Sequence, residues 1–187
     1  MSAGPNKVDL SAYDNSWYRP GGPIKRGFWY FFNLIFVRNK YQPFNGLRIF
    51  VLRLFGARIG AGVVLKPGIN IKYPWLLSIG DHSWIGEDVW IDNLAQITIG
   101  SDVCISQGAM LLCGNHNYKS ISFDLIVSPI LLESGSWVGA QSTVCPGVTL
   151  GSHAILTVGS VAVSDLEAYG IYQGNPAAFV KTREISQ

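Results

Sequence analysis

A repeat of six residues runs through the middle of the chain from Ile59 onward, and an internal repeat constrains the fold more than any local propensity does. Its clearest copies read IGDHSW, IGEDVW, IGSDVC, VGAQST, VCPGVT and LGSHAI. The first place is always aliphatic: Ile79, Ile85, Ile99, Ile105, Val138, Val144, Leu150 and Leu156. The fifth place is small or β-branched: Ser83, Val89, Val103, Ala109, Ser142, Val148, Ala154 and Ser160.

A period of six excludes an α-helix, whose period is 3.6 residues, and does not fit a lone hairpin with its period of 2. It fits a short parallel strand plus a turn, three to a coil, with each coil stacked about 4.8 Å from the last. The aliphatic residue then points into the coil, and glycine in second place relieves a tight turn. We therefore predict an all-β fold, a parallel β-helix over residues 59–170, whose coils are stable because they stack.

The residues before the repeat, 1–58, are rich in aromatic residues and predict a partly helical segment packed on the β-helix. The run FWYFFNLIFV, residues 28–37, is apolar throughout, and residues 44–57 continue with helical spacing. The first run is shorter than the roughly 20 residues of a membrane span. Two interpretations stay open, because Arg26 and Arg38 flank it: a packed helix, or peripheral contact with a membrane surface.

Composition limits the classes of partner and the compartment. The net charge is +2 and no block of Lys and Arg resembles a stripe that reads phosphates, so we expect no nucleic-acid partner. The N-terminus lacks a charged region followed by an apolar run, which predicts a cytoplasmic protein. The three cysteines, Cys104, Cys113 and Cys145, have no CxxC spacing and predict free thiols. Cys113 precedes His116 by three residues, so a nucleophilic pair stays open beside a buried apolar role.

The repeat breaks once, over residues 113–129, CGNHNYKSISFDLIVSP. Coils on either side must still stack, so the insertion is expected to leave the body as a loop that returns at Pro129. Loops carried on rigid scaffolds are where functional groups concentrate. His116 lies at the root of this loop between Asn115 and Asn117, in a turn-forming context. It either bonds loop backbone or takes part in chemistry.

The chain resembles the hexapeptide-repeat acyltransferases, and among them the colanic acid biosynthesis acetyltransferases. The resembling segments include SIGDHSWIGEDVWIDN, SWVGAQSTVCPGVTLG and GIYQGNPAAFVKTR, and the resemblance runs through nearly the whole chain. It implies a left-handed β-helix, acetyl-CoA as co-substrate, no metal, and a homotrimer with its site between subunits. The acceptor it implies is a sugar or lipid-linked glycan of exopolysaccharide assembly. Three tryptophans in sixth place suit such an interface: Trp84, Trp90 and Trp137.

In that family a histidine of this loop is the general base, which corresponds to His116 here. A sugar hydroxyl is a poor nucleophile, whereas the thioester is already activated, so a base is the missing group. General bases typically contribute about 10²–10⁴-fold. No acyl-enzyme is required.

Acceptor-binding candidates surround this histidine. Asp92 and Asn93 lie about one coil earlier, and we expect Asp92 to orient the imidazole. For Asn93 two roles stay open: binding a sugar hydroxyl or only shaping a turn. Asn115 and Asn117 are further acceptor-binding candidates. The acceptor-binding Asn of the sugar acetyltransferases falls on Gly86, so the acceptor pocket is expected to differ from theirs.

The coenzyme arm is expected along turns of small residues, where backbone N–H groups are accessible. The resemblance implies these cofactor-binding positions: Gly139, Ala140, Val158 and Gly159. In the C-terminal tail, residues 171–187, Lys181 and Arg183 are expected to meet the 3′-phosphate, or are merely solvated. Ala178 falls where several relatives carry a basic residue.

Other functions stay open. The γ-type carbonic anhydrases share the fold and hold zinc on three histidines, and this chain has three: His82, His116 and His153. Zinc needs ligands that converge at about 2.0–2.1 Å, whereas His82 and His153 are several coils apart. A non-catalytic β-helical scaffold is a second alternative. The third is transfer to another acceptor, such as an amino sugar, serine or an antibiotic.

Overall fold

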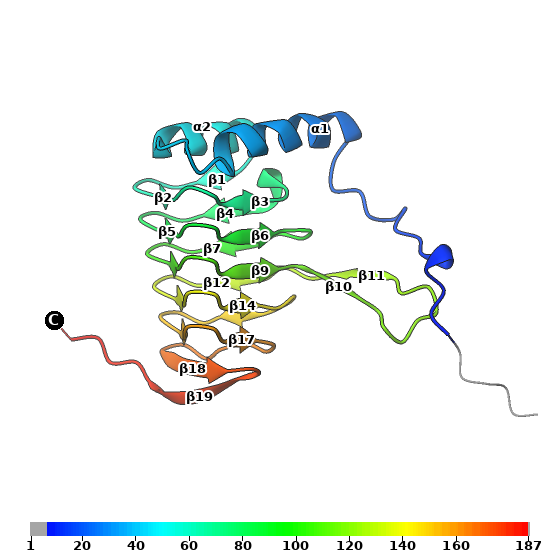
Figure 1. Cartoon of the computed structure of the whole chain (residues 1–187). Coiled ribbons are helices and arrows are strands. Elements are labelled where there is room, and N and C mark those ends of the chain that lie inside the picture. The colour runs from blue at the N-terminus through cyan, green and yellow to red at the C-terminus, as the bar shows by residue number, and fades with distance from the viewer. Residues whose placement is uncertain (1–6, 187) are drawn as a thin grey trace, which may run out of the picture.

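The computed structural model of this protein describes residues 7–186 and has a three-sided parallel β-helix as its body (Figure 1). Each coil gives one short strand to each of three parallel sheets. Sheet A contains β1 (Arg58–Ile59), β4 (Leu77–Ile79), β7 (Ile97–Ile99), β12 (Ile130–Leu132) and β15 (Thr149–Leu150). Sheet C contains β3 (Asn70–Ile71), β6 (Trp90–Asp92), β9 (Met110–Leu112), β14 (Thr143–Val144) and β17 (Val161–Ala162).

Sheet B is the longest of the three. It contains β2 (Val64–Leu65), β5 (Trp84–Ile85), β8 (Cys104–Ile105), β13 (Trp137–Val138), β16 (Ile155–Leu156), β18 (Gly170–Gly174) and β19 (Ala177–Thr182). The last strand pairs antiparallel with β18. Residues 171–182, expected as part of a separate tail, therefore complete this sheet.

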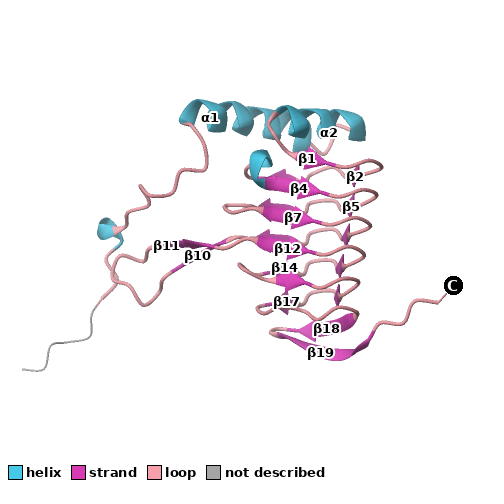
Figure 2. Ribbon diagram, turned by 180° about the vertical axis from the view of Figure 1, so that it is seen from behind, coloured by secondary structure: helices cyan, strands magenta, loops and turns pink. Residues whose placement is uncertain are grey.

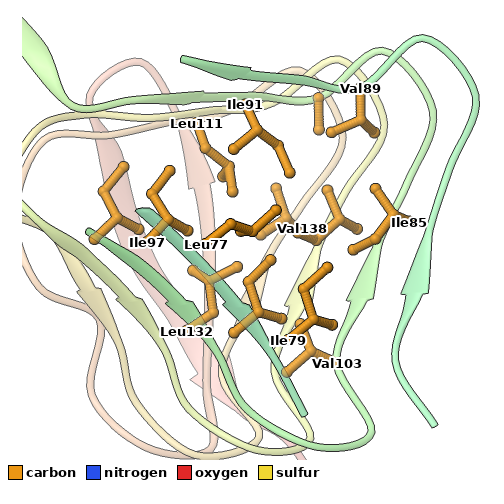
Figure 3. Packing of buried hydrophobic residues seen from close by; sticks show 14 of the residues in the cluster. Leu77, Ile79, Ile85, Val89, Ile91, Ile97, Val103, Leu111, Leu132 and Val138 are labelled. Carbon is orange, nitrogen blue, oxygen red and sulfur yellow. The ribbon is translucent and has the colours of Figure 1, made fainter. Parts of the chain in front are cut away.

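The register follows the hexapeptide positions. Ile79 pairs with Ile99, Ile99 with Leu132, and Leu132 with Leu150, so equivalent first places stack directly. All the first-place aliphatic and fifth-place small residues named above are buried. Figure 3 shows some of them, including Ile79, Ile85 and Val103, inside the coils. The expected parallel β-helix, with a helical N-terminal part and one protruding loop, is confirmed.

Two helices cover the first coil: α1 (Pro23–Phe32), which continues through a π-helical turn, η2 (Asn33–Val37), and α2 (Asn45–Leu54) (Figure 2). Their side chains bond backbone groups at the open edge of the sheets. Trp29 Nε1 donates to Ile71 O at 3.0 Å. Asn45 Nδ2 donates to Val63 O at 2.9 Å while its Oδ1 accepts from Leu65 N. We call these two helices with η2 the cap. Within the described chain, no helix has the length and apolarity needed to cross a bilayer.

The insertion folds as an antiparallel hairpin of β10 (Gly114–His116) and β11 (Leu125–Val127). It continues outward from β9, at the corner between sheets C and A (Figure 1). The N-terminal segment, which includes η1 (Leu10–Ala12), descends from α1 to the hairpin, where Asp9 N donates to Ile121 O at 2.9 Å. A short helix, η3 (Pro74–Leu76), lies at the same corner between β3 and β4, immediately after the first coil.

Candidate active site

His116 ends the first strand of the hairpin and is half-buried. Its Nδ1 lies 2.9 Å from the carbonyl oxygen of Phe123, on the other side of the hairpin. The two rings stack with centroids 4.5 Å apart and planes inclined by 8°. Tyr13 of the N-terminal segment approaches the same imidazole at 5.9 Å between centroids. The imidazole is therefore positioned by the Phe123 carbonyl and ring, with the ring of Tyr13 nearby.

The bond to Phe123 decides the tautomer of His116. A carbonyl oxygen can only accept, so Nδ1 carries the proton and Nε2 keeps its lone pair. Phe123 has φ of 52°, a left-handed conformation that bulky residues rarely adopt. The strained turn at Phe123 thus supplies the group that orients the imidazole. Sequence patterns did not indicate Phe123, because a backbone carbonyl leaves no mark on residue type.

The asparagines beside His116 shape the hairpin. Asn115 is exposed, and its Oδ1 accepts a hydrogen bond from His116 N at 2.8 Å. Asn117 Oδ1 accepts from Lys119 N at 3.2 Å. Both side chains keep their Nδ2 groups for other partners.

Asp92 does not orient His116. Its register partner on the next coil is Leu112, four residues before the histidine, because β10 carries His116 away from the body. The carboxylate instead faces Lys72, with 2.9 Å between Lys72 Nζ and Asp92 Oδ1. This contact is an ion pair without hydrogen-bond geometry, since Asp92 Oδ1 accepts no hydrogen bond among the described residues. The expected orienting role passes to the Phe123 carbonyl.

Asn93 serves the turn and not a ligand. It is fully buried. Its Oδ1 accepts from Tyr73 N at 2.9 Å, and its Nδ2 donates to the carbonyls of Tyr73 and Leu76. The side chain holds the neighbouring coil in place and presents no free polar atom to a sugar. Of the two roles that the sequence left open, the structure supports the turn.

A cysteine nucleophile is unsuited to this site. Cys113 is fully buried in the core, and burial raises the pKa of its thiol to about 11. A nucleophilic cysteine must be a thiolate at working pH. Cys113 therefore packs as a small apolar residue.

The residues expected to hold the coenzyme meet at the corner between sheets B and C. Gly139 and Ala140 follow β13, and Val158 and Gly159 follow β16 on the next coil. Gly159 N donates to Ala140 O at 2.9 Å, so the two turns lie directly against each other. A Cβ at Gly139 would lie 2.6 Å from Val158 N, which only glycine avoids. Val158 is exposed beside this junction.

Lys181 and Arg183 lie on the outer face of sheet B. They line a cavity of about 600 Å³ together with Trp137, Ile155 and Ile171. Arg183 Nη1 donates to Gly135 O at 2.9 Å and to His153 O at 3.1 Å, so part of its guanidinium is engaged with backbone. Lys181 is exposed. Lys181 is thus the freer of the two cations.

In a single chain, His116 is far from the turns expected to hold the coenzyme. His116 protrudes from the corner between sheets C and A, whereas the turns of Gly139 and Gly159 form the corner between sheets B and C. The whole width of sheet C separates the two corners. One subunit alone therefore does not bring the imidazole to the turns expected to hold the coenzyme.

The three tryptophans expected at a subunit interface do not lie on one face of the prism. Trp84 and Trp137 share one outward ladder of sheet B through Cys104, whereas Trp90 lies on sheet C. At Gly86 a Cβ would lie 2.5 Å from Gln107 N, so no side chain fits where the family's Asn falls.

The three histidines occupy different parts of the fold. His82 and His153 lie in left-handed turns, where His153 stacks on Tyr169 with centroids 4.8 Å apart. Between residues 7 and 186, no three His, Cys, Asp or Glu side chains are arranged to hold a metal ion.

The comparison with known proteins decides the family. No family model matches the chain. The colanic acid biosynthesis acetyltransferase WcaF of Escherichia coli (strain K12) is 36% identical over 176 residues, covering 94% of this chain and 97% of that protein. The chain belongs to the hexapeptide-repeat acetyltransferases of this family. The resemblance read from its sequence is confirmed.

More distant acetyltransferases share the architecture. The galactoside O-acetyltransferase of Escherichia coli (strain K12) is 25% identical over 138 residues, covering 70% of this chain and 64% of that protein. The hexapeptide-repeat acetyltransferase VCA0836 of Vibrio cholerae, solved with acetyl coenzyme A, superposes with a TM-score of 0.77 at 22% identity, covering 87% of this chain and 88% of that one. These hexapeptide-repeat neighbours agree with the predicted fold.

Proposed function

We propose that this acetyltransferase transfers the acetyl group of acetyl-CoA to a hydroxyl of a sugar in exopolysaccharide assembly, with His116 as general base. The observation that carries the proposal is the bond of His116 Nδ1 to the Phe123 carbonyl, because it leaves Nε2 as a proton acceptor on a protruding loop. Membership of the family named above supports the reaction class. The name of the WcaF relative supports the acceptor class.

The reaction needs no acyl-enzyme. Nε2 of His116 takes the hydroxyl proton while the sugar oxygen attacks the thioester carbonyl carbon. The tetrahedral oxyanion collapses, the carbon–sulfur bond breaks, and the imidazolium returns its proton to the leaving thiolate. Free backbone N–H groups of a coil turn would stabilise the oxyanion.

We infer that the coenzyme lies along the corner between sheets B and C. The turns of Gly139, Ala140, Val158 and Gly159 leave room for a pantetheine arm close to the backbone. Lys181 faces an adjoining cavity and would pair with the 3′-phosphate, with Arg183 as a weaker contributor because it already bonds two carbonyls.

A homotrimer would complete this site. The hairpin of one subunit and the coenzyme turns of its neighbour would meet, which a single chain does not achieve. The exposed ladder of sheet B supports such a contact, because Trp84 and Trp137 are 61% and 43% exposed in the single chain. Each site would then contain residues of two copies.

Substitution of His116 tests the proposal. We expect His116→Ala to lower turnover by at least about a hundredfold, with the thermal unfolding midpoint and acetyl-CoA binding unchanged. Acetyl transfer to nucleotide sugars, oligosaccharides and lipid-linked glycans is the measurement. His82→Asn is the matched control, since asparagine tolerates the left-handed turn at His82. Near-normal turnover of His116→Ala would remove the imidazole from the mechanism.

We further propose that the cap contacts the inner face of an anionic membrane, where free cysteines stay reduced. Its outer surface exposes apolar side chains: Ile24, Phe28, Phe31, Ile35, Phe50 and Leu54. Residues 15–80 hold ten Lys and Arg but no Asp or Glu, whereas the rest of the chain holds four Lys and Arg and all twelve acids. The small net charge conceals this segregation. Basic and aromatic surfaces bind anionic bilayers together.

Vesicle sedimentation tests the membrane contact. The protein should sediment with phosphatidylglycerol vesicles and not with phosphatidylcholine vesicles, and high salt should release it. Phe28→Ser with Phe31→Ser should weaken this binding about tenfold or more, since each buried Phe contributes about 1.5–3 kcal/mol. Exposed Phe179 of β19 gives the control, Phe179→Ser. Equal binding to both lipids would refute the contact.

A further inference from the structure

A cavity of about 370 Å³ lies between the cap and the outer face of sheet C. This volume falls within the range of about 300–1,000 Å³ typical of small-molecule sites. One wall is α1 with η2, and the other is formed by β3 and β6. Nothing in the proposed chemistry of His116 uses this cavity so far.

Cationic side chains outnumber acidic ones on its walls. Arg26 and Arg38 come from the two ends of the α1–η2 segment, and Lys72 comes from the end of β3. Asp92 is the one acidic residue of the lining and faces Lys72. Within residues 7–186, neither arginine forms an ion pair. Two unpaired guanidinium groups and one ammonium around one cavity suit an anion with several oxygens, such as a diphosphate.

The floor offers oxygen acceptors. Asn33 is only 8% exposed, and its Nδ2 donates to Asn70 Oδ1 at 3.1 Å. Its Oδ1 has no hydrogen-bond partner among the described residues, whereas Asp92 Oδ1 is paired with the ammonium of Lys72 at 2.9 Å. A buried acceptor without a donor costs about 1–3 kcal/mol. A sugar hydroxyl is the kind of donor that Asn33 Oδ1 lacks, and the Asp92 carboxylate beside it is a further acceptor.

Aromatic side chains complete the lining. Trp90 and Tyr30 lie on opposite walls, and both are partly exposed. Flat rings of this kind pack against the apolar faces of sugar rings. Tyr30 and Leu34 also belong to the exposed apolar surface of the cap, so the cavity opens onto a surface that suits a hydrocarbon chain.

The cavity ends where the hairpin begins. Asp92 pairs with Leu112, after which the chain leaves the body toward His116. A Cβ at Gly114 would lie 3.9 Å from Asp92 Oδ2, so the carboxylate reaches the base of β10. Figure 1 shows α1, the ends of the sheet C strands and the hairpin on one side of the molecule.

We propose that this cavity binds a sugar carrying a diphosphate group, with Arg26 and Arg38 on the diphosphate and Asn33 and Asp92 on sugar hydroxyls. This proposal rests on the proposed acetyl transfer to a sugar, because it identifies where the sugar acceptor of that reaction is bound. The diphosphate links the sugar either to a lipid chain or to a nucleoside. The two sources share the chemistry that the cavity recognises.

Direct binding without acetyl-CoA tests this site. The probes are geranyl-diphosphate-linked glucose and UDP-glucose, with glucose and glucuronic acid as comparisons, measured by calorimetry. We expect at least one diphosphate probe to bind more tightly than glucose and glucuronic acid. Arg38→Gln and Arg26→Gln should each weaken binding roughly tenfold, as expected for a lost charge-assisted bond. Arg58→Gln, an exposed cation of sheet A, should leave binding unchanged.

Tighter binding of the geranyl probe would identify the lipid source, and tighter binding of UDP-glucose the nucleoside source. The proposal is overturned if neither diphosphate probe binds, if glucuronic acid binds equally well, or if Arg58→Gln weakens binding as much as Arg38→Gln. The binding experiment measures no acetyl transfer, so its outcomes are independent of His116. If the probes bind here but the separate transfer assay detects no acetylation of any sugar acceptor, this binding site stands and the proposed function is refuted.

Discussion

The coils and the hairpin differ in how their side chains are held in place. In the coils, each inward side chain is fixed by neighbours above and below, as with Ile91 between Ile71 and Leu111. In the hairpin, one carbonyl and one ring fix His116. Stability is therefore concentrated where the repeat is regular, and chemistry is proposed where it breaks. Substitutions should separate the two regions.

The largest effect is expected in the coils. Leu132→Ala removes a fully buried side chain that Figure 3 shows in the interior, and should lower the free energy of unfolding by about 2–5 kcal/mol. Leu131→Ala, its neighbour on β12, is the control, because Leu131 points outward and is 38% exposed. Urea denaturation measures both. Similar losses for the two variants would contradict the inward and outward assignment.

A smaller effect is expected at a corner of the coils. Asn93→Ala leaves the turn at Tyr73 and Leu76 without three hydrogen bonds and should cost about 1–3 kcal/mol of unfolding free energy. The acceptor KM should stay unchanged. Asn115→Ala is the control for stability, since Asn115 is exposed on the hairpin. A raised acceptor KM with unchanged stability would return Asn93 to the binding site.

The smallest effect is expected in the hairpin and concerns kcat. Phe123→Leu removes the ring stacked on His116, an interaction of about 0.5–1.5 kcal/mol, so kcat should fall about two- to tenfold. The unfolding midpoint should not move, and the pH profile of kcat should shift, because Phe123 acts by positioning the base. Tyr118→Leu on the same hairpin is the control. An unchanged kcat and pH profile in Phe123→Leu would show that the Phe123 ring does not position His116.

The sequence predicted the body well because hexapeptide spacing is itself a record of stacking. Ile79 and Val144 are buried for the reason that placed them first in their repeats. Contacts that depend on the direction in which a loop leaves the coils were harder to predict. Asp92 lies about one coil before His116, yet β10 carries the histidine away from it. The Phe123 carbonyl could not be predicted, because its role depends on the backbone angle and not on the side chain.

The cap shows the same limit from another side. Helical periodicity predicted the helices, but not that Asn45 would bond Val63 and Leu65 or that Arg26 and Arg38 would face one cavity with Lys72. Those arrangements depend on how the helices dock across the first coil. The segregation of charge over residues 15–80 was readable in the sequence, although the net charge of +2 hid it.

Covering one end of the stack with helices governs how copies of this chain can aggregate. An uncovered parallel coil offers a row of free N–H and C=O groups to any identical edge, which is the geometry from which fibrils grow. Here α1 and α2 block one end, whereas at the other end β19 extends sheet B in the antiparallel direction and places Lys181 and Pro176 beside the rim. Addition of an identical coil is thereby blocked at the end that the helices cover, and the flanks of the prism remain surfaces for lateral self-association.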